Sequence, residues 1–188
     1  MIERLLVSGF GGQGIMTLGK TLAQTAMDEG LETTYFPSYG AEVRGGTANC
    51  HVILSDEPIY SPRVEEADTL VIMNQPSYER FRPILKPSGI LLINASMTEP
   101  RGERESASPA RLLSIPATEI ANDLGNVRVA NTVMLAAFAE AWHGVPAEAC
   151  WKALEASLSG RHKHLLEVNR QAFERGRTAA AKIRRDWS

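Results

Sequence analysis

The amino-acid sequence predicts an α/β fold in three layers, a mostly parallel sheet between helices, with a helical C-terminal tail. Three observations predict this class. Short apolar runs alternate with segments of helical periodicity through the first half of the chain. The strand-like runs are apolar nearly throughout, which is typical of parallel strands buried on both faces. The last third of the chain has a helical pattern.

The first predicted elements are a strand, a glycine-rich turn and a helix. Leu5–Val7 is a buried-strand run that ends at Gly9. Apolar residues then recur at helical spacing from Ile15 to Ala26, and Gly30 ends the pattern. A strand followed directly by a helix is the first unit of the predicted sandwich.

Four further strands and one short helix complete the predicted sheet region. The strands are runs of β-branched and apolar residues bounded by proline, glycine or acidic residues: 33–36, 49–54, 69–73 and 90–93. The short helix spans residues 76–85, and Pro87 and Gly89 are expected to end it.

The second half of the chain is predicted to be mainly helical. Thr98–Pro109 is polar and rich in Arg, Glu and Ser, which indicates an exposed excursion. Ile115 marks a last short strand, and Pro116 begins a helix. Three longer helices are predicted at 131–143, 147–158 and 163–185. Because the sequence has neither an internal repeat nor a low-complexity tract, we expect a single domain over residues 1–188.

Composition excludes several classes of protein. The chain has 188 residues, of which 44% are hydrophobic and 22% charged, and these fractions exclude a disordered or fibrous protein. A net charge of −2 argues against a nucleic-acid binder. No apolar run approaches the roughly 20 residues of a membrane span. Because a strand-like segment stands where a signal peptide would, we expect a cytoplasmic protein.

The cysteines and histidines do not form a pattern that predicts a metal site. Cys50 and Cys150 form no CxxC pair, so we exclude a zinc ribbon or an iron–sulfur cluster held by this chain alone. Cys50 has no base near it in sequence and is expected to be a small buried thiol. His51 lies inside a predicted strand and is expected to be a packed or edge histidine instead of a ligand. His162 and His164 are two residues apart and share no helical face.

Positive charge is concentrated near the C-terminus. From Arg161 onward there are eight lysines and arginines against three acidic residues, so the rest of the chain is net negative. Such a basic helix is most often a solvated face or a surface that docks on an acidic partner. Trp142, Trp151 and Trp187 fall in this helical tail and are expected to pack it down.

The first motif that carries chemical information is the run GFGGQG at residues 9–14, between a strand and a helix. Its glycines fit GxGxxG in a Rossmann-like context, where free N–H groups at a helix N-terminus attract phosphate. The candidate cofactor-binding residues are Gly9, Gly11, Gly12, Gln13, Gly14 and Lys20. A nicotinamide site is disfavoured because no acidic residue ends the second strand near Pro37. A tight turn that binds no ligand is the alternative.

The second motif is SYGAEVRGGTANC at residues 38–50, at the exit of a predicted strand. Its glycines imply positions that a side chain would obstruct or that another surface approaches closely. Glu42 and Arg44 either pair with each other or face a partner subunit or a substrate carboxylate. The candidates for a substrate cleft or subunit interface are Ser38, Tyr39, Gly40, Glu42, Arg44, Gly45, Gly46 and Asn49.

The two motifs together resemble the γ subunit of the 2-oxoacid:ferredoxin oxidoreductases. The resemblance rests on GFGGQGIMTLGK followed by FPSYGAEVRGGTANC, and extends to VILSDEPI and LKPSGIL further along the chain. It runs from Leu5 to about Ile93 with specific motifs and more loosely beyond. Enzymes of this family convert a 2-oxoacid and coenzyme A to an acyl-CoA, CO2 and reduced ferredoxin.

The resemblance implies a subunit that is inactive alone and supplies no catalytic residue and no metal ligand. Thiamine diphosphate and magnesium are expected between α and β subunits, and iron–sulfur clusters on partners such as a δ subunit, which pass electrons to ferredoxin. Residues 9–14 and Lys20 are expected to contact coenzyme A phosphates. Residues 38–49 are expected to form the wall toward the α/β active site, within one γ-type domain.

The resemblance leaves the substrate and two alternatives open. It favours a 2-oxoglutarate or branched-chain 2-oxoacid enzyme, with pyruvate and indolepyruvate as further possibilities. The first alternative is a free-standing nucleotide- or CoA-binding Rossmann-like module that regulates another protein. The second is an interaction protein whose glycine loops serve subunit contacts alone.

Overall fold

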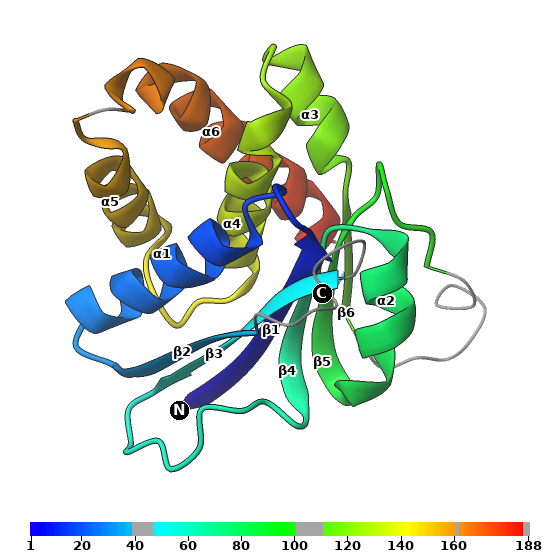
Figure 1. The fold of residues 1–188 in the computed structure, drawn as a ribbon, viewed down its shortest axis with the longest axis vertical. Coiled ribbons are helices and arrows are strands. Elements are labelled where there is room, and N and C mark those ends of the chain that lie inside the picture. Colours follow the sequence, from blue (N-terminus) through cyan, green and yellow to red (C-terminus); the bar gives the residue numbers. More distant parts are fainter. Residues whose placement is uncertain (39–46, 101–110, 161, 186–188) are drawn as a thin grey trace.

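The computed structural model describes residues 1–38, 47–100, 111–160 and 162–185. These residues form a six-stranded sheet with the strand order β2-β3-β1-β4-β5-β6 (Figure 1). The strands are β1 (Ile2–Phe10), β2 (Glu32–Ser38), β3 (Thr47–Ser55), β4 (Ala67–Ile72), β5 (Leu85–Asn94) and β6 (Arg111–Ile115). Strands β1, β4, β5 and β6 are mutually parallel, whereas β3 is antiparallel to both of its neighbours. The sheet is therefore mostly parallel, as predicted, with one reversed strand.

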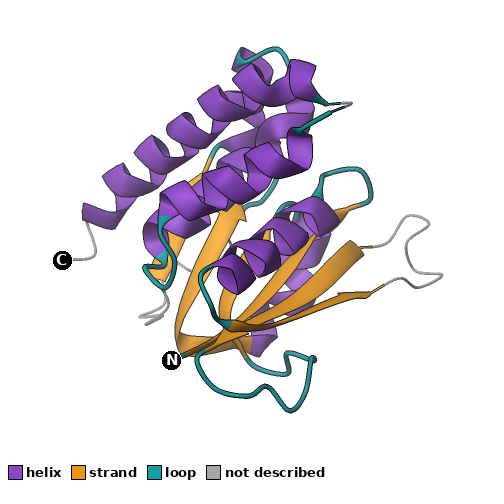
Figure 2. Ribbon diagram, turned by 90° about the vertical axis from the view of Figure 1, so that its left-hand side faces the viewer, coloured by secondary structure: helices purple, strands orange, loops and turns teal. Residues whose placement is uncertain are grey.

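Helices cover both faces of the sheet. They are α1 (Ile15–Asp28), α2 (Gln75–Phe81), α3 (Ala117–Asp123), α4 (Ala130–Ala141), α5 (Ala147–Leu158) and α6 (Leu166–Arg184). Figure 2 shows the larger helical layer stacked on one side of the sheet. Helices α1, α4, α5 and α6 pack there, and α2 packs on the opposite face. The predicted α/β sandwich with a helical tail is confirmed.

The alternation of side chains along each strand divides the core into two clusters. Leu5 and Val7 of β1 point toward the larger helical layer, and Leu6 between them points toward α2. All three are at most 1% exposed. Because both faces bury apolar side chains, the central strands need the continuous apolar runs that the sequence contains.

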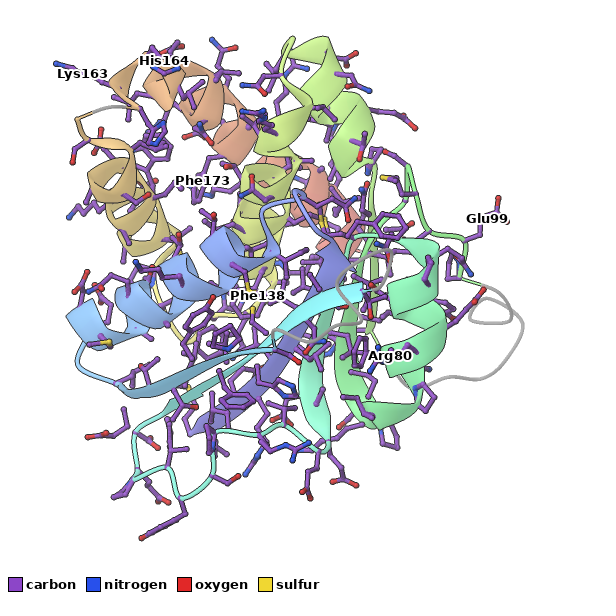
Figure 3. All side chains as sticks on the ribbon, in the orientation of Figure 1. Arg80, Glu99, Phe138, Lys163, His164 and Phe173 are labelled. Carbon is purple, nitrogen blue, oxygen red and sulfur yellow. The ribbon has the colours of Figure 1, made fainter. Side chains whose placement is uncertain are left out.

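The C-terminal helices belong to the same core as the sheet. Phe138 of α4 and Phe173 of α6 are fully buried (Figure 3). A Cβ atom at Gly176 of α6 would lie 2.3 Å from the carbonyl oxygen of Val133 in α4, so the two helices touch backbone to backbone there. Trp142 is buried as well, together with Trp151 of α5, whereas Trp187 lies outside the described residues.

Two predicted boundaries are wrong. The helix predicted at 76–85 ends at Phe81 and continues as a 3-10 turn, and Pro87 and Gly89 lie within β5 instead of a loop. The pairing of β4 with β5 shifts register between Ala67 and Thr69. A bulge of this kind accommodates a proline, because the residues inside it make no regular ladder hydrogen bonds.

Four arginines of α6 have acidic partners within the chain. Arg170 pairs with Glu174, Arg175 with Asp123, Arg177 with Glu140 and Glu148, and Arg184 with Glu140, at 3.0–3.7 Å. This helix therefore offers less unpaired charge to an acidic partner than the sequence pattern indicates. Separately, no helix in the described part of the chain is long and apolar enough to cross a membrane.

Candidate functional site: the glycine turn at the carboxyl edge of the sheet

The glycine motif lies at the carboxyl edge of the parallel strands. Residues 9–14 connect the end of β1 to the start of α1. Neighbouring β4 ends beside it and continues into Met73 and Asn74, and β5 ends next at Asn94. Open α/β sheets bind ligands at this edge. The motif thus stands where the fold provides a binding site.

Three of the four glycines in the turn are required by its geometry. Gly12 and Gly14 have φ angles of +91° and +76°, in the left-handed region that favours glycine. A Cβ atom at Gly9 would lie 2.7 Å from the Cβ atom of Met73. Gly11 differs, because a Cβ atom there would have no neighbour within 4 Å. The absence of a side chain at Gly11 therefore leaves open space beside the turn.

Helix α1 begins at this turn with its N-terminal amides uncapped. Gly14 is the N-cap residue and contributes no side-chain hydrogen bond, and the first turn of the helix contains no acidic residue. The first backbone N–H groups of an α-helix have no partner inside the helix. Together with the helix dipole, such groups attract an anion. The arrangement is chemically suited to a phosphate group.

Gln13 fastens the turn to the neighbouring strand. Its Oε1 accepts a hydrogen bond from the Phe10 backbone N–H at 2.6 Å and a longer one from Asn74 Nδ2 at 3.4 Å. Its Nε2 donates to the Met73 carbonyl oxygen at 3.4 Å. These hydrogen bonds hold the turn in place, so Gln13 has a structural role in the motif.

Three asparagines surround the turn and join Gln13 in what we call the amide cluster: Gln13, Asn74, Asn94 and Asn131. Asn94 Nδ2 lies 3.5 Å from the same Met73 carbonyl oxygen and donates to Thr118 Oγ1 at 2.8 Å. Asn131 of α4 donates to the Gly14 carbonyl oxygen at 3.4 Å. Asn74 and Asn94 are buried, at 1% and 0% exposure. The cluster ties β1, β4, β5 and α4 together around the glycine turn.

Sequence reasoning missed the three asparagines. The sequence could have indicated Asn74 and Asn94, since each lies at the carboxyl end of a buried strand. Asn74 also caps α2 through a hydrogen bond that its Oδ1 accepts from the Ser77 N–H. Asn131 is 117 residues from Gly14 and has no local signal.

The described ends of the second motif reach the same edge. Ser38 of β2 is paired with Asn49 of β3, which is paired in turn with Ser8 of β1. Asn49 is buried within the chain at 6% exposure. Thr47 Oγ1 accepts a hydrogen bond from Arg80 Nη1 at 3.2 Å, which ties the end of the motif to α2 (Figure 3). Tyr39, Gly40, Glu42, Arg44, Gly45 and Gly46 lie outside the described residues.

Lys20 is not a member of the amide cluster. Its exposed side chain lines a groove between α1 and α5, opposite Lys152. The structure therefore brings together residues 9–14, Ser38 and Asn49 at one edge, and places Lys20 in a different surface feature.

The buried thiols and His51 have packing roles. Burial raises the pKa of Cys50 to about 12 and that of Cys150 to about 11, so neither thiol is a nucleophile near neutral pH. His51 Nδ1 accepts a hydrogen bond from the Val64 N–H at 3.0 Å, and burial lowers the pKa of this histidine. The expectations of a buried Cys50 and a packed His51 are confirmed. Within the described ranges, no group of three His, Cys, Asp or Glu residues could hold a metal ion.

The fold and the site together define a class: an α/β protein with a phosphate-type glycine turn at the carboxyl edge of a mostly parallel sheet. Comparison with known proteins gives the family. The family model described as pyruvate ferredoxin/flavodoxin oxidoreductase matches residues 4–179. The chain belongs to this family.

One curated relative is longer than this chain. The chain is 38% identical over 174 residues to the ketoisovalerate oxidoreductase subunit VorA of Methanothermobacter thermautotrophicus. That match covers 92% of this chain and 35% of VorA, so the chain spans about a third of the length of this relative.

Two solved structures share the fold. The γ subunit of a keto/oxoacid ferredoxin oxidoreductase from Geobacter sulfurreducens aligns with a TM-score of 0.79 and 29% identity, over 96% of this chain and 99% of that one. The 2-oxoglutarate:ferredoxin oxidoreductase from Magnetococcus marinus, solved with 2-oxoglutarate, coenzyme A and succinyl-CoA bound, aligns with a TM-score of 0.86 and 24% identity. The alignment covers 96% of this chain and 31% of that one. Because the identity is low, this likeness shows a shared fold and nothing further.

Proposed function

We propose that this chain is the γ subunit of a cytoplasmic multisubunit 2-oxoacid:ferredoxin oxidoreductase, and that its glycine turn binds a phosphate group of coenzyme A. The single observation that carries the proposal is the uncapped start of α1 beside the open space at Gly11. The Magnetococcus marinus enzyme, which shares this fold, was solved with coenzyme A bound, and this supports the choice of ligand.

In this proposal, some residues of the turn bind the phosphate and others hold the turn in shape. The first N–H groups of α1 attract the phosphate, and Gly11 lets it approach the backbone closely. Gln13 and Asn131 hold the turn in its bound shape without contacting the reacting atoms, because their polar atoms bond to the turn itself. Preorganisation of this kind reduces the entropy cost of binding.

The redox and thiamine cofactors belong to companion subunits in this proposal. Cys50 and Cys150 are both buried, and two thiols fall short of the four thiolates that hold an iron–sulfur cluster. When bound between α and β subunits with magnesium, thiamine diphosphate supplies the carbon–carbon bond cleavage. A δ subunit carrying clusters and ferredoxin complete the expected set of partners. This chain contributes no catalytic acid, base or nucleophile.

The substrate that we favour is 2-oxoglutarate or a branched-chain 2-oxoacid. The names of VorA and of the Magnetococcus marinus enzyme support these two choices. Pyruvate and indolepyruvate are the alternatives. The second motif, residues 38–49, is proposed as the wall toward the active site, with Arg44 facing a carboxylate or a partner subunit.

Substitution of Gly11 in the reconstituted complex tests the function. Gly11 is not in the left-handed region and has open space, so Gly11→Ala and Gly11→Glu should fold normally. A carboxylate at a helix N-terminus competes with a phosphate, and we expect Gly11→Glu to raise the KM for coenzyme A about ten-fold or more, equivalent to about 1.4 kcal/mol. We expect Gly11→Ala to raise it less, and the KM for the 2-oxoacid to stay unchanged in both.

Tyr60→Glu is the matched control. Tyr60 is 95% exposed and lies between β3 and β4, at the opposite end of the sheet from the turn. An unchanged coenzyme A KM in Gly11→Glu would reject the phosphate site. If the chain purifies without companion subunits and binds NADH tightly in calorimetry, the regulatory-module alternative is favoured instead.

A further inference from the structure

A long groove runs along the outer side of the larger helical layer, between α1 and α5. Its volume is about 1070 Å³. The apolar part of its lining comes from four segments of the chain: Met16, Tyr35, Ala153, Ala156, Leu158 and Leu165. Figure 1 shows α5 beside α1 at the left-hand side of the molecule, and the two helices belong to the same hydrophobic cluster. The groove is separate from the amide cluster, none of whose members lines it.

Two lysines face this groove from its opposite walls. Lys20 stands on α1 and Lys152 on α5, and both side chains are exposed. Neither lysine has an ion-pair partner among the described residues, although four arginines of α6 are paired within the chain. Asp28, at the far end of the groove, accepts a hydrogen bond from Gln24. The groove thus combines an apolar floor with two positive charges that form no ion pair within the described part of the chain.

The dimensions of the groove fit a helix better than a small ligand. Its lining extends along α1 from Met16 to Asp28, and the rise of a helix over these thirteen residues is about 18 Å, or a little over three turns. Small-molecule sites enclose most of their ligand. Here the rim residues Thr17, Lys152 and Ala156 are exposed along the length of the groove, which leaves one side open.

We propose that the α1–α5 groove docks an acidic amphipathic helix of a companion subunit. The apolar residues of that helix, spaced at i, i+3/i+4 and i+7, lie on the floor of the groove. Its carboxylates lie beside Lys20 and Lys152, where charge complementarity selects the partner and its orientation. This inference rests on the proposed function, since it requires a complex with other subunits, and it assigns Lys20 to assembly instead of coenzyme A binding.

Charge reversal in the co-expressed complex tests the proposal. We expect the double variant Lys20→Glu/Lys152→Glu to lower recovery of companion subunits at least ten-fold in size-exclusion chromatography. Ala156→Trp, which fills the exposed rim, should have a similar effect. Lys20→Arg/Lys152→Arg should retain recovery. Lys182→Glu is the matched control, because Lys182 is an exposed lysine of α6 outside the groove.

Cross-linking identifies the occupant. A photoreactive amino acid at Thr17, on the rim, should link in the purified complex to an acidic, helically patterned peptide of another subunit, and the same group at Tyr60 should not. Cross-links to a second copy of this chain, or links that coenzyme A abolishes, would overturn the proposal. So would full recovery of the complex with the charge-reversed variant. If the wild-type chain recovers no companion subunit at all, the proposed function itself fails.

Discussion

Glu3 is a carboxyl group in an unusual environment at the amino end of β1. It is 9% exposed, and Thr69 Oγ1 donates a hydrogen bond to its Oε1 at 2.6 Å. Burial, reinforced by Asp68, raises its pKa from an ordinary 4.5 to about 7, against the lowering effects of Thr69, Lys86 and Trp142. It also lines a cavity of about 320 Å³. The buried carboxyl is therefore partly protonated near neutral pH.

The pH dependence of stability should reveal Glu3. Because its folded-state pKa lies above its unfolded value, its contribution is complete below about pH 4.5 and is lost as the pH rises through about 7. Glu3→Gln mimics the neutral form. We expect equal unfolding free energies at pH 4.5, and by pH 8 a variant more stable than the wild type by about 3 kcal/mol.

Urea unfolding at several pH values measures this difference. Glu57→Gln is the control, since it makes the same substitution at an exposed carboxyl. Parallel stability curves for Glu3→Gln and the wild type would show that Glu3 stays ionised in the folded state.

The glycine turn shows which properties of single residues can be predicted from the sequence. The turn was predictable because its glycines, the preceding strand and the following helix are adjacent in sequence. The roles of individual glycines were not, because Gly9 is constrained by Met73 and Gly14 by Asn131, both distant in sequence. The motif predicts that Lys20 accompanies the turn, and the packing of α1 on α5 also makes Lys20 part of the lining of a groove, which no local pattern indicates.

At the scale of elements, the contact between α4 and α6 anchors the helical tail. Gly176 is buried, and the Val133 carbonyl oxygen and Ala136 Cβ lie 2.3 and 3.0 Å from where its Cβ atom would be. Helix α6, which the sequence predicts as a basic amphipathic helix, therefore packs into the core with one face. Its arginines form ion pairs with acidic residues of the same chain. Removing the helix would delete Phe173 from the core and uncover Trp151 of α5, whose ring Phe173 contacts, so a truncation of the tail would test folding instead of docking.

Gly176→Ala should destabilise the chain. In an exposed helix the change is favourable by about 1 kcal/mol, whereas here the added methyl group overpacks the α4 contact and costs about 1–3 kcal/mol net. The loss is measured as a lower thermal midpoint. Thr178→Ala, at an exposed position on the same helix, should leave it nearly unchanged. A midpoint equal to or above that of the wild type would contradict close packing at Gly176.

At the scale of the whole molecule, the sheet and the helical layer share one continuous core. Side chains of β1, β3, β4 and β5 form a single cluster with those of α1, α4, α5 and α6. Neither layer can be removed without exposing the other. We therefore propose that residues 1–188 form one cooperative domain.

Unfolding in urea should proceed in a single transition. Trp142 and Trp151 are buried in the helical layer, so tryptophan fluorescence reports on that layer, while far-UV circular dichroism reports on all the elements. We expect the two midpoints to coincide. An earlier fluorescence transition would show that the helical tail is a separate unit, and the single-domain proposal would be wrong.

The class of fold, the order of most elements and the position of the phosphate-type turn follow from the sequence alone. These depend on the spacing of apolar residues and on glycines within a few positions of one another. The tertiary structure decided the insertion of antiparallel β3 between β1 and β2, the amide cluster around Gly14, the pairing of the α6 arginines and the groove at Lys20. Each of these features joins segments far apart in the chain. Such contacts form only when the elements pack, so no local sequence pattern predicts them.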